Sequence, residues 1–275
     1  MPVIGLISRE GSPVADAALA DAAAWLSAHH RAVAVLTRES PPSALADLEL
    51  VIAFGGDGTL LGAAHAVALA GRDVPVLGIN LGHLGFLTEV SRAEMIDALQ
   101  AVLDGRTRTE TRIMLCGRVE RGGRVVAERL ALNDIVVTRG ALSRMIEVDV
   151  SVDGLLVTHI KADGVIVATA TGSTAYNLSA GGPILLPSVD AMVLTPIAPH
   201  TLSNRPVVLP ATATIVLRPV IEPQEDLLAT FDGQFGVDLQ TGDAIVVTRA
   251  ERVVTLLRVT DRTHFDMLRE KLRWG

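Results

Sequence analysis

The chain has 275 residues, 49% of them hydrophobic and 20% charged, which supplies enough apolar side chains for a large buried core and argues against disorder. The formal net charge of -7 argues against a nucleic-acid partner, although a local cationic site for an anionic substrate is compatible with it. Cys116 is the single cysteine, so an internal disulfide and a cluster of thiolate metal ligands are both excluded.

The first part of the chain alternates short apolar strands with alanine-rich helices. Strands are predicted at 3–7, 33–36, 48–54 and 74–79, and helices at 14–30, 59–70 and 94–103. Strands that are apolar throughout and separated by helices are typical of a parallel sheet covered on both faces. We therefore expect residues 1–105 to form an α/β domain with a Rossmann-like parallel sheet.

The pattern changes beyond residue 105, where alternating and β-branched segments dominate. Strands are predicted at 113–120, 124–130, 135–138, 145–152, 155–160, 164–169, 207–209, 214–218, 227–231, 244–248 and 252–259. Glycine-containing turns separate several of them, which favours antiparallel pairing. We expect residues 106–259 to form a β-rich domain. An amphipathic helix over 263–274 is expected to return to the first domain, which residues 260–275 would complete.

Neither a targeting signal nor a membrane span is predicted. The apolar segment 3–7 is short and is followed by Arg9 and Glu10, unlike a secretion signal. No segment reaches the roughly 18 consecutive apolar residues that a membrane helix needs. We therefore expect a cytoplasmic protein with no membrane partner. The only lysines are Lys161 and Lys271, which argues against a Schiff base or a phosphate-binding lysine.

The stretch between Asp163 and Arg205 is almost free of charge. Asp190 is its only acidic or basic residue, and glycine, serine, threonine, proline and asparagine are abundant. Such a segment suits the wall of a binding site that contacts a ligand through main-chain groups and hydroxyls. The alternative is a set of ordinary turns between buried strands.

The clearest local motif is GGDGT at residues 55–59, between a predicted strand and a predicted helix. In a parallel sheet this loop lies at the carboxyl end of a strand, where ligands bind. Its glycines allow close approach of phosphate oxygens, and the helix start offers unpaired N–H groups. Asp57 would then hold a magnesium ion or accept a proton from an attacking hydroxyl. The alternative is a strand-to-helix turn in which Asp57 is a cap.

Other well-known site motifs are missing. No G-x-x-x-x-G-K-[ST] sequence occurs, and Gly62 comes one residue late for the dinucleotide pattern G-x-G-x-x-G. A P-loop and a hydride-transferring Rossmann enzyme are therefore disfavoured. Neither H-E-x-x-H nor G-x-S-x-G is present, and the seven histidines lack metal-ligand spacing.

A second glycine-rich loop, GINLGHLGFLTE at residues 78–89, also follows a predicted strand. It would lie beside the GGDGT loop if the two strands are neighbours. Phe86 would then form a wall for a heterocyclic ring, or alternatively a hydrophobic plug.

These segments together resemble the ATP- or polyphosphate-dependent NAD kinases. The resemblance covers about residues 50–235 and rests on the order and spacing of GGDGT, GINLGHLGFLTE, residues 132–134, 163–183, 199–206 and 232–234. GGDGT alone is shared with diacylglycerol-type lipid kinases and phosphofructokinases, whereas the uncharged block TGSTAYNLSAGGP is much more specific. Ala170 stands where many members of the family have proline.

The resemblance implies an activity: transfer of a phosphoryl group to the 2′-hydroxyl of the adenosine ribose of NAD, giving NADP. Asp57 matches the essential aspartate of the family. Gly55, Gly56, Gly58 and Thr59 would hold the donor phosphates. A divalent metal, Mg²⁺ or another ion, would supply the positive charge that no lysine supplies there. It would be held mainly by the donor phosphates.

The resemblance also implies that residues 106–259 bind the dinucleotide. The implied NAD contacts are Asp57, Gly58, Phe86, Asn133, Asp134, Arg144, Lys161, Asp163, Thr171, Thr174, Ala175, Tyr176, Asn177, Ser179, Ala198 and Gln234. Tyr176 would offer a stacking face, whereas without the resemblance Asn133 and Asp134 would be interpreted as an Asx turn. A homo-oligomer, dimer or tetramer, with sites shared between subunits is also implied.

Two alternatives remain open at this point. A lipid or sugar kinase shares the GGDGT loop, but would not explain the block TGSTAYNLSAGGP. A non-catalytic dinucleotide sensor would keep the binding pocket, but would have no need for Asp57.

Overall fold

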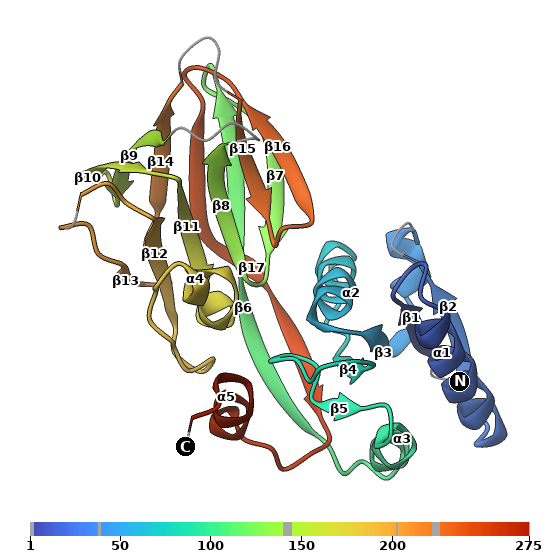
Figure 1. Cartoon of the computed structure of the whole chain (residues 1–275). Helices are drawn as coiled ribbons and strands as arrows, with labels where there is room; N and C mark the ends of the chain where they lie inside the picture. Colours follow the sequence, from blue (N-terminus) through green and yellow to red (C-terminus); the bar gives the residue numbers. More distant parts are fainter. Residues whose placement is uncertain (1–2, 38–39, 140–144, 202, 222–225, 275) are drawn as a thin grey trace. The chain divides into compact units, whose positions relative to one another are not determined.

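A computed structural model describes residues 3–37, 40–139, 145–201, 203–221 and 226–274. The chain forms two compact units, Met1–Arg112 with Val253–Gly275, and Ile113–Arg252 (Figure 1). The chain passes between the units inside two strands, β6 (Arg108–Arg121) and β17 (Ala244–Arg258), so no turn or linker marks either passage in the sequence. The domain boundaries expected at residues 105 and 259 stay a prediction.

The first unit is an α/β structure. In chain order its elements are β1 (Val3–Ser8), α1 (Pro13–Ala28), β2 (Ala32–Leu36), the 3-10 helix η1 (Pro42–Leu45), β3 (Leu48–Gly55), α2 (Asp57–Leu69), β4 (Val76–Asn80), β5 (Val90–Ser91), α3 (Met95–Leu103) and α5 (His264–Leu272). Its parallel strands follow the order β2–β1–β3–β4, and β5 and the end of β17 also pair with β4 in parallel.

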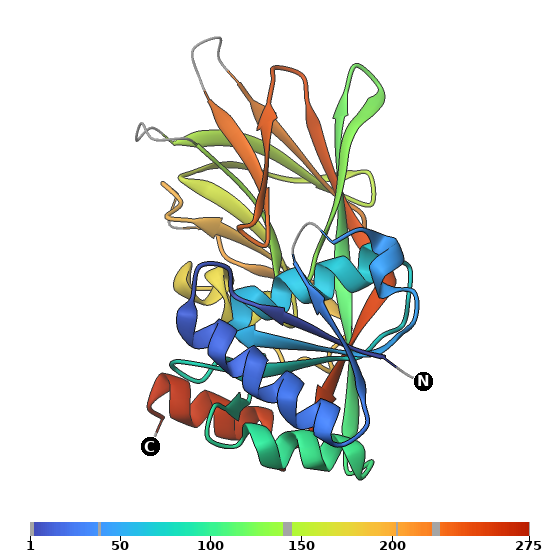
Figure 2. The same ribbon diagram turned by 90° about the vertical axis from the view of Figure 1, so that its right-hand side faces the viewer.

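The helices of this unit cover both faces of the sheet. Helices α1 and α3 share a core with strand residues such as Ile4, Ile52 and Leu77, whereas α2 packs on β3 and β4 from the opposite face (Figure 2). Helix α1 buries Ala15, Ala18, Ala22 and Leu26, a spacing of three to four residues that aligns them along one helical stripe. Ser12 caps its first turn by accepting a hydrogen bond from the N–H of Ala15.

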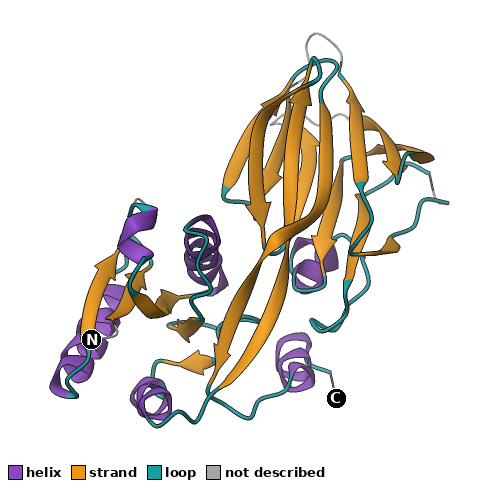
Figure 3. Ribbon diagram, turned by 180° about the vertical axis from the view of Figure 1, so that it is seen from behind, coloured by secondary structure: helices purple, strands orange, loops and turns teal. Residues whose placement is uncertain are grey.

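The second unit is built almost entirely of strands (Figure 3). It contains parts of β6 and β17 and, in chain order, β7 (Arg124–Ala131), β8 (Asp134–Arg139), β9 (Ile146–Val152), β10 (Leu155–Ala162), β11 (Gly164–Thr169), the 3-10 helix η2 (Gly172–Thr174), α4 (Tyr176–Ser179), β12 (Ala191–Ile197), β13 (Val207–Pro210), β14 (Ile215–Val220), β15 (Leu227–Phe231) and β16 (Phe235–Leu239).

These strands form antiparallel layers around one core. One layer has the order β13–β12–β11–β8–β15–β16, and the other contains the run β10–β9–β14–β17. Apolar side chains of both layers, including Val167, Phe231 and Val148, are fully buried in one cluster. The predicted fold class, an α/β domain followed by a β-rich domain with the last helix in the first unit, is confirmed.

Some predicted elements differ from the structure. The strands expected at 244–248 and 252–259 are one continuous strand, β17, because Arg249, Glu251 and Arg252 occupy exposed positions without interrupting the pairing. Strand β12 was not predicted, because it is buried on both faces and contains Pro196, so it lacks an alternating pattern. Within the part of the chain that the structure describes, no helix is long and apolar enough to cross a membrane.

Candidate active site

The sheet order creates a crevice at the carboxyl ends of β1 and β3. Strand β2 lies on one side of β1, whereas β3 and then β4 lie on its other side. The connection that leaves β1 and the connection that leaves β3 therefore run in opposite directions, which opens a crevice between them. The register brings these ends level, since Ser8 lies opposite Phe54 and Gly55 lies opposite Asn80. The loops after β1, β3 and β4 therefore leave the same edge of the sheet.

The GGDGT loop follows β3 and forms the start of α2. At Gly55 a Cβ atom would lie 2.2 Å from Oγ1 of Thr59, so the fold of the loop itself requires glycine there. At Gly56 and Gly58 a Cβ atom would meet nothing within 4 Å. The last two glycines are thus not needed for packing, and they place no side chain between the helix start and a ligand.

Asp57 joins the GGDGT loop to the loop that follows β4. Its Oδ2 accepts a hydrogen bond from the N–H of Phe86 at 2.8 Å. Its Oδ1 accepts three, from the N–H groups of Leu87 at 3.1 Å and Thr88 at 3.0 Å and from Oγ1 of Thr88 at 2.8 Å. The carboxylate is therefore held in one orientation by three successive main-chain donors and a hydroxyl. This confirms that the two loops are adjacent, as neighbouring strands would require.

The same contact depends on a glycine in the second loop. A Cβ atom at Gly85 would lie 1.8 Å from Oδ1 of Asp57 and 2.4 Å from Oγ1 of Thr88. The second loop can pack on the carboxylate only because Gly85 has no side chain.

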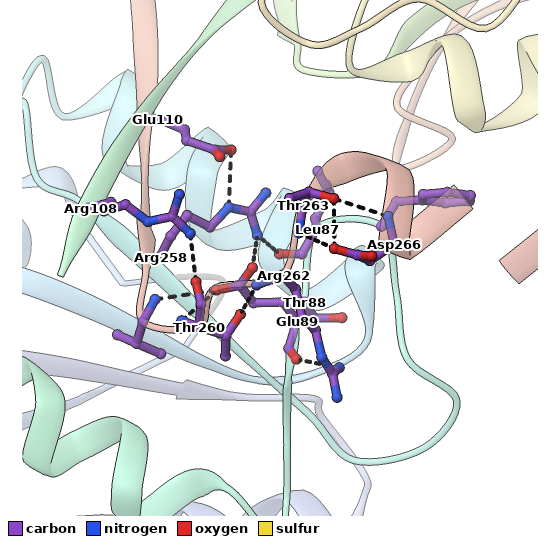
Figure 4. Close-up of polar contacts among 12 residues, drawn as sticks. Leu87, Thr88, Glu89, Arg108, Glu110, Arg258, Thr260, Arg262, Thr263 and Asp266 are labelled. Atoms are coloured by element: carbon purple, nitrogen blue, oxygen red, sulfur yellow. Dashed lines mark hydrogen bonds and ion pairs between the residues drawn. The ribbon is translucent and has the colours of Figure 1, made fainter. Parts of the chain in front are cut away.

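The other side of this loop is held by the end of β17 and the segment before α5 (Figure 4). The buried Arg258 donates to the main-chain oxygen of Leu87 at 3.0 Å and forms ion pairs with Glu89 at 3.4 Å and Glu110 at 3.1 Å. The buried Glu89 accepts hydrogen bonds from the N–H groups of Val259 and Thr260. Residues 87–89 are thus fixed by a chain segment far away in the sequence.

A pocket of about 250 Å³ adjoins the GGDGT loop. Its lining comes from the end of β1, the loop after it and the first turns of α2: Ile7, Ser8, Arg9, Glu10, Thr59 and Gly62. Arg9 is exposed and has no ion-pair partner among the described residues. Arg9 is not among the site residues predicted from the sequence. The available signal was its position directly after the first parallel strand.

Phe86, in the second loop, is half-buried. Nζ of Lys271, on α5, lies 5.8 Å from the centre of its ring, within the range of a cation–π contact.

In the second unit, the loop at residues 132–134 lies against the turn that begins the TGSTAYN segment. Oγ1 of Thr169 donates to the main-chain oxygen of Leu132 at 2.6 Å and accepts from the N–H of Gly172 at 3.0 Å. A Cβ atom at Gly172 would lie 2.0 Å from the main-chain oxygen of Asn133. These contacts bring together two of the segments that the resemblance assigned to NAD.

Two acids lie at this loop, the buried Asp134 and the half-buried Asp232. The carboxylate of Asp232 accepts hydrogen bonds from three successive N–H groups, those of Leu132 at 2.8 Å, Asn133 at 2.7 Å and Asp134 at 3.0 Å. The side chain of Asp134 accepts no hydrogen bond within the described chain and is only 5% exposed. Burial, together with the charge of Asp232, raises the pKa of Asp134 to about 7. Burial also raises the pKa of Asp232.

The TGSTAYN segment contains both buried and exposed candidates. The amide of Asn177 is fully buried and donates to the main-chain oxygens of Ser173 and Pro183, while its oxygen accepts from Oγ1 of Thr195 at 2.7 Å. All of its side-chain groups therefore organise the loop itself. Tyr176 is 47% exposed, so its ring is open to a ligand.

The remaining candidates are spread along the second unit. Thr171 is buried, Asn133, Thr174, Ala175 and Gln234 are half-buried, and Ser179, Ala198, Lys161 and Asp163 are exposed. Nζ of Lys161 forms an ion pair with Glu147 at 2.6 Å. Ala198 has a φ of 44°, a left-handed conformation that is uncommon for alanine. Arg144 lies outside the described residues. The predicted role of each of these residues stays a prediction.

Two family models match the chain. The ATP-NAD kinase N-terminal domain matches residues 13–107, and the ATP-NAD kinase C-terminal domain matches residues 132–259. An NAD kinase of Geobacter metallireducens is 47% identical over 248 residues, which cover 90% of this chain and 86% of that protein. An NAD kinase of Magnetococcus marinus is 44% identical over 290 aligned positions, covering 100% of this chain and 94% of that protein.

Two solved structures are similar over nearly the whole chain. The crystal structure of a yeast NADH kinase complexed with NADH gives a TM-score of 0.90 at 25% identity, covering 100% of this chain and 88% of that one. The crystal structure of an NAD kinase from Archaeoglobus fulgidus in complex with ATP gives 0.80 at 26% identity, covering 99% and 100%.

Replacing Gly85 by alanine is expected to separate the second loop from Asp57. The added methyl group would lie 1.8 Å from Oδ1, so the carboxylate or the loop has to move. We expect urea unfolding to show a loss of about 1–3 kcal/mol and the amides of residues 86–88 to exchange hydrogen faster. Gly82→Ala is the matched control, because a Cβ there meets nothing within 4 Å. Equal behaviour of the two variants would contradict the packing described.

The raised pKa of Asp134 predicts a pH dependence of stability. Because this pKa rises from 3.8 to about 7 on folding, the folded state binds the extra proton and stability falls as the pH rises between these values. Asp134→Asn should remove this fall, which amounts to at most about 4 kcal/mol at ~1.4 kcal/mol per pKa unit.

Urea unfolding of Asp134→Asn at pH 4 and pH 8 checks this expectation. The variant should match the parent at the lower pH and exceed it at the higher one. Asp238→Asn, at an exposed aspartate of the same unit, is the control. A stability gain that is the same at both pH values would show that Asp134 is not the titrating group.

Proposed function

The chain belongs to the NAD kinase family, and we propose that Asp57 and the loops around it carry out the phosphoryl transfer to NAD that defines this family. The predicted enzyme class is thereby confirmed, since relatives at 44–47% identity over most of the chain are NAD kinases. The roles of individual residues, the metal and the oligomer are the proposal. The observation that carries it is the orientation of the Asp57 carboxylate at the open start of α2.

The chemistry requires a group such as Asp57. A ribose hydroxyl is a weak nucleophile, so the enzyme has to orient it toward the phosphorus atom and take up its proton as the new bond forms. A carboxylate held by Phe86, Leu87 and Thr88 meets the first need without moving. It meets the second because Oδ2 accepts only one of the four hydrogen bonds to the carboxylate and so keeps a free acceptor site.

We assign the donor phosphates to the pocket beside the GGDGT loop. The open positions Gly56 and Gly58 let phosphate oxygens approach the helix start, and Thr59 lines the same pocket. Arg9 supplies a positive charge there that the two lysines of the chain do not. ATP is the donor that this proposal adopts, because the Archaeoglobus relative was crystallised with it.

A divalent metal would reach this site with the donor. Among the described residues, no group of three potential ligands from histidine, cysteine, aspartate and glutamate is close enough to hold a metal ion. The residues present therefore suit an ion such as Mg²⁺ that is bound mainly by phosphate oxygens, where it would neutralise developing charge.

We assign the dinucleotide to the second unit. The exposed ring of Tyr176 offers a face on which an adenine can stack, and the loop of Asn133 and Asp134 offers polar groups for ribose hydroxyls. Asn177 would act indirectly, by holding the loop that carries Tyr176.

We also propose a homo-oligomer. Strand β10 is at the end of its sheet, and its Leu155 and Leu156 are 74% and 70% exposed. An edge strand with exposed apolar side chains favours burial against another chain. A second copy is the partner that the family resemblance implies.

Asp57→Asn tests the catalytic role. With purified protein, Mg²⁺, NAD and either ATP or polyphosphate, we expect NADP formation to fall by about 10²- to 10⁴-fold. The dissociation constant for NAD should change much less. Loss of NAD binding together with activity would instead point to a structural role.

The parent protein in the same assay separates the alternatives. NAD binding without NADP from either donor would favour a sensor. Phosphorylation of diacylglycerol without NAD binding would favour a lipid kinase.

Arg9→Ala tests the donor pocket. Because a hydrogen bond to a charged group contributes about 1.5–3 kcal/mol, we expect the KM for ATP to rise by about tenfold or more, with the KM for NAD little changed. Arg72→Ala is the control, since Arg72 is also exposed on the first unit but does not line the pocket. Equal effects of the two substitutions would place the donor elsewhere.

A further inference from the structure

Two buried polar side chains beside Asp57, an amide and a hydroxyl, have been given no part of their own in the proposed reaction. Asn80, the last residue of β4, is 3% exposed, and Thr88 in the second loop is fully buried. Both belong to a chain of hydrogen bonds that ends on the Asp57 carboxylate. Nδ2 of Asn80 lies 2.8 Å from Oγ1 of Thr88, which lies 2.8 Å from Oδ1 of Asp57.

The direction of this chain is fixed by its far end. The N–H of Gly82 lies 2.8 Å from Oδ1 of Asn80, and a main-chain N–H can only donate. The Asn80 oxygen must therefore face Gly82, so its NH₂ group faces Thr88 and donates to it. Thr88 has a single hydroxyl hydrogen, and with Asn80 as its donor that hydrogen points to Asp57.

The two oxygens of Asp57 are consequently not equivalent. Oδ1 accepts three hydrogen bonds, from the N–H groups of Leu87 and Thr88 and from the Thr88 hydroxyl. Oδ2 accepts one, from the N–H of Phe86. Because a carboxylate oxygen has about two lone-pair sites, Oδ1 is saturated, whereas Oδ2 keeps a free acceptor site.

We propose that Asn80 and Thr88 are positioning residues that anchor Oδ1 of Asp57 and so reserve Oδ2 for the attacking hydroxyl. This rests on the proposed catalytic role of Asp57. In the transfer, the 2′-oxygen forms a bond to the γ-phosphorus of ATP while the bond from that phosphorus to the bridging oxygen breaks. The hydroxyl proton passes to Oδ2, and ADP leaves with the electron pair of the broken bond.

The shape of Thr88 permits a matched pair of substitutions. Thr88→Val keeps the shape and the methyl group but removes the hydroxyl, whereas Thr88→Ser keeps the hydroxyl and removes the methyl group. That methyl group packs on Gly78, where a Cβ would lie 2.6 Å from Cγ2 of Thr88. A packing role predicts that serine is the more harmful replacement, and a positioning role predicts that valine is.

Steady-state kinetics of these variants test the proposal. We expect Thr88→Val to lower kcat by about 10- to 100-fold, with the KM values for NAD and ATP changed by less than about threefold. Thr88→Ser should restore kcat to within about threefold of the parent. In an Asp57→Asn background, Thr88→Val should have no further effect, because Thr88 acts through Asp57.

The outcomes separate this inference from the function on which it rests. If Asp57→Asn itself left kcat intact, the proposed role of Asp57 would fail. If Asp57→Asn abolished turnover while Thr88→Val did not lower kcat, only the positioning role would be overturned. The same would follow if Thr88→Val lowered kcat further in the Asp57→Asn background. Should Thr88→Val fail to fold, Asn80→Ala tests the same chain, and an unchanged kcat in that folded variant would overturn the inference.

Discussion

The first unit depends on one interaction, the clamp of the Asp57 carboxylate on the main-chain N–H groups of residues 86–88. Without the carboxylate, these three successive N–H groups would lose their shared acceptor. The clamp needs Gly85, whose missing side chain makes room for the carboxylate. It also needs the anchor on the far side of the loop, where Arg258 and Glu89 bind it to the end of β17. An acidic side chain in a glycine loop is therefore a structural part as well as the proposed reactive group.

The second unit uses the same device. Asp232 accepts hydrogen bonds from the N–H groups of three successive residues, 132–134, just as Asp57 does for 86–88. Aspartate suits this task because its short side chain presents two oxygens to a concave run of main-chain donors. In both units the clamped loop is one that the NAD kinase resemblance assigns to the site. A loop that is already held in place lowers the conformational-entropy cost of binding a ligand.

Local charge, rather than net charge, makes an anionic donor acceptable to this acidic chain. The charge of Asp57 is directed into the loop that it clamps, while the helix start beside it carries a partial positive charge. Arg9 adds a full positive charge on the wall of the same pocket. Lys161, one of only two lysines, is paired with Glu147 in the second unit. Arg9 and a metal ion bound by the donor phosphates would then together neutralise the negative charge of those phosphates.

Local patterns in the sequence were sufficient for the fold class and the main loops. Apolar runs separated by helices required a covered parallel sheet, and glycines around Asp57 marked a loop that meets a ligand or another chain segment. The partners of that loop were decided only by tertiary structure. Arg9, Thr88 and Arg258 meet the site through strand register and packing, which no local spacing encodes. The same holds for Asn177, because no local pattern indicates that its side-chain amide pairs with Ser173, Pro183 and Thr195.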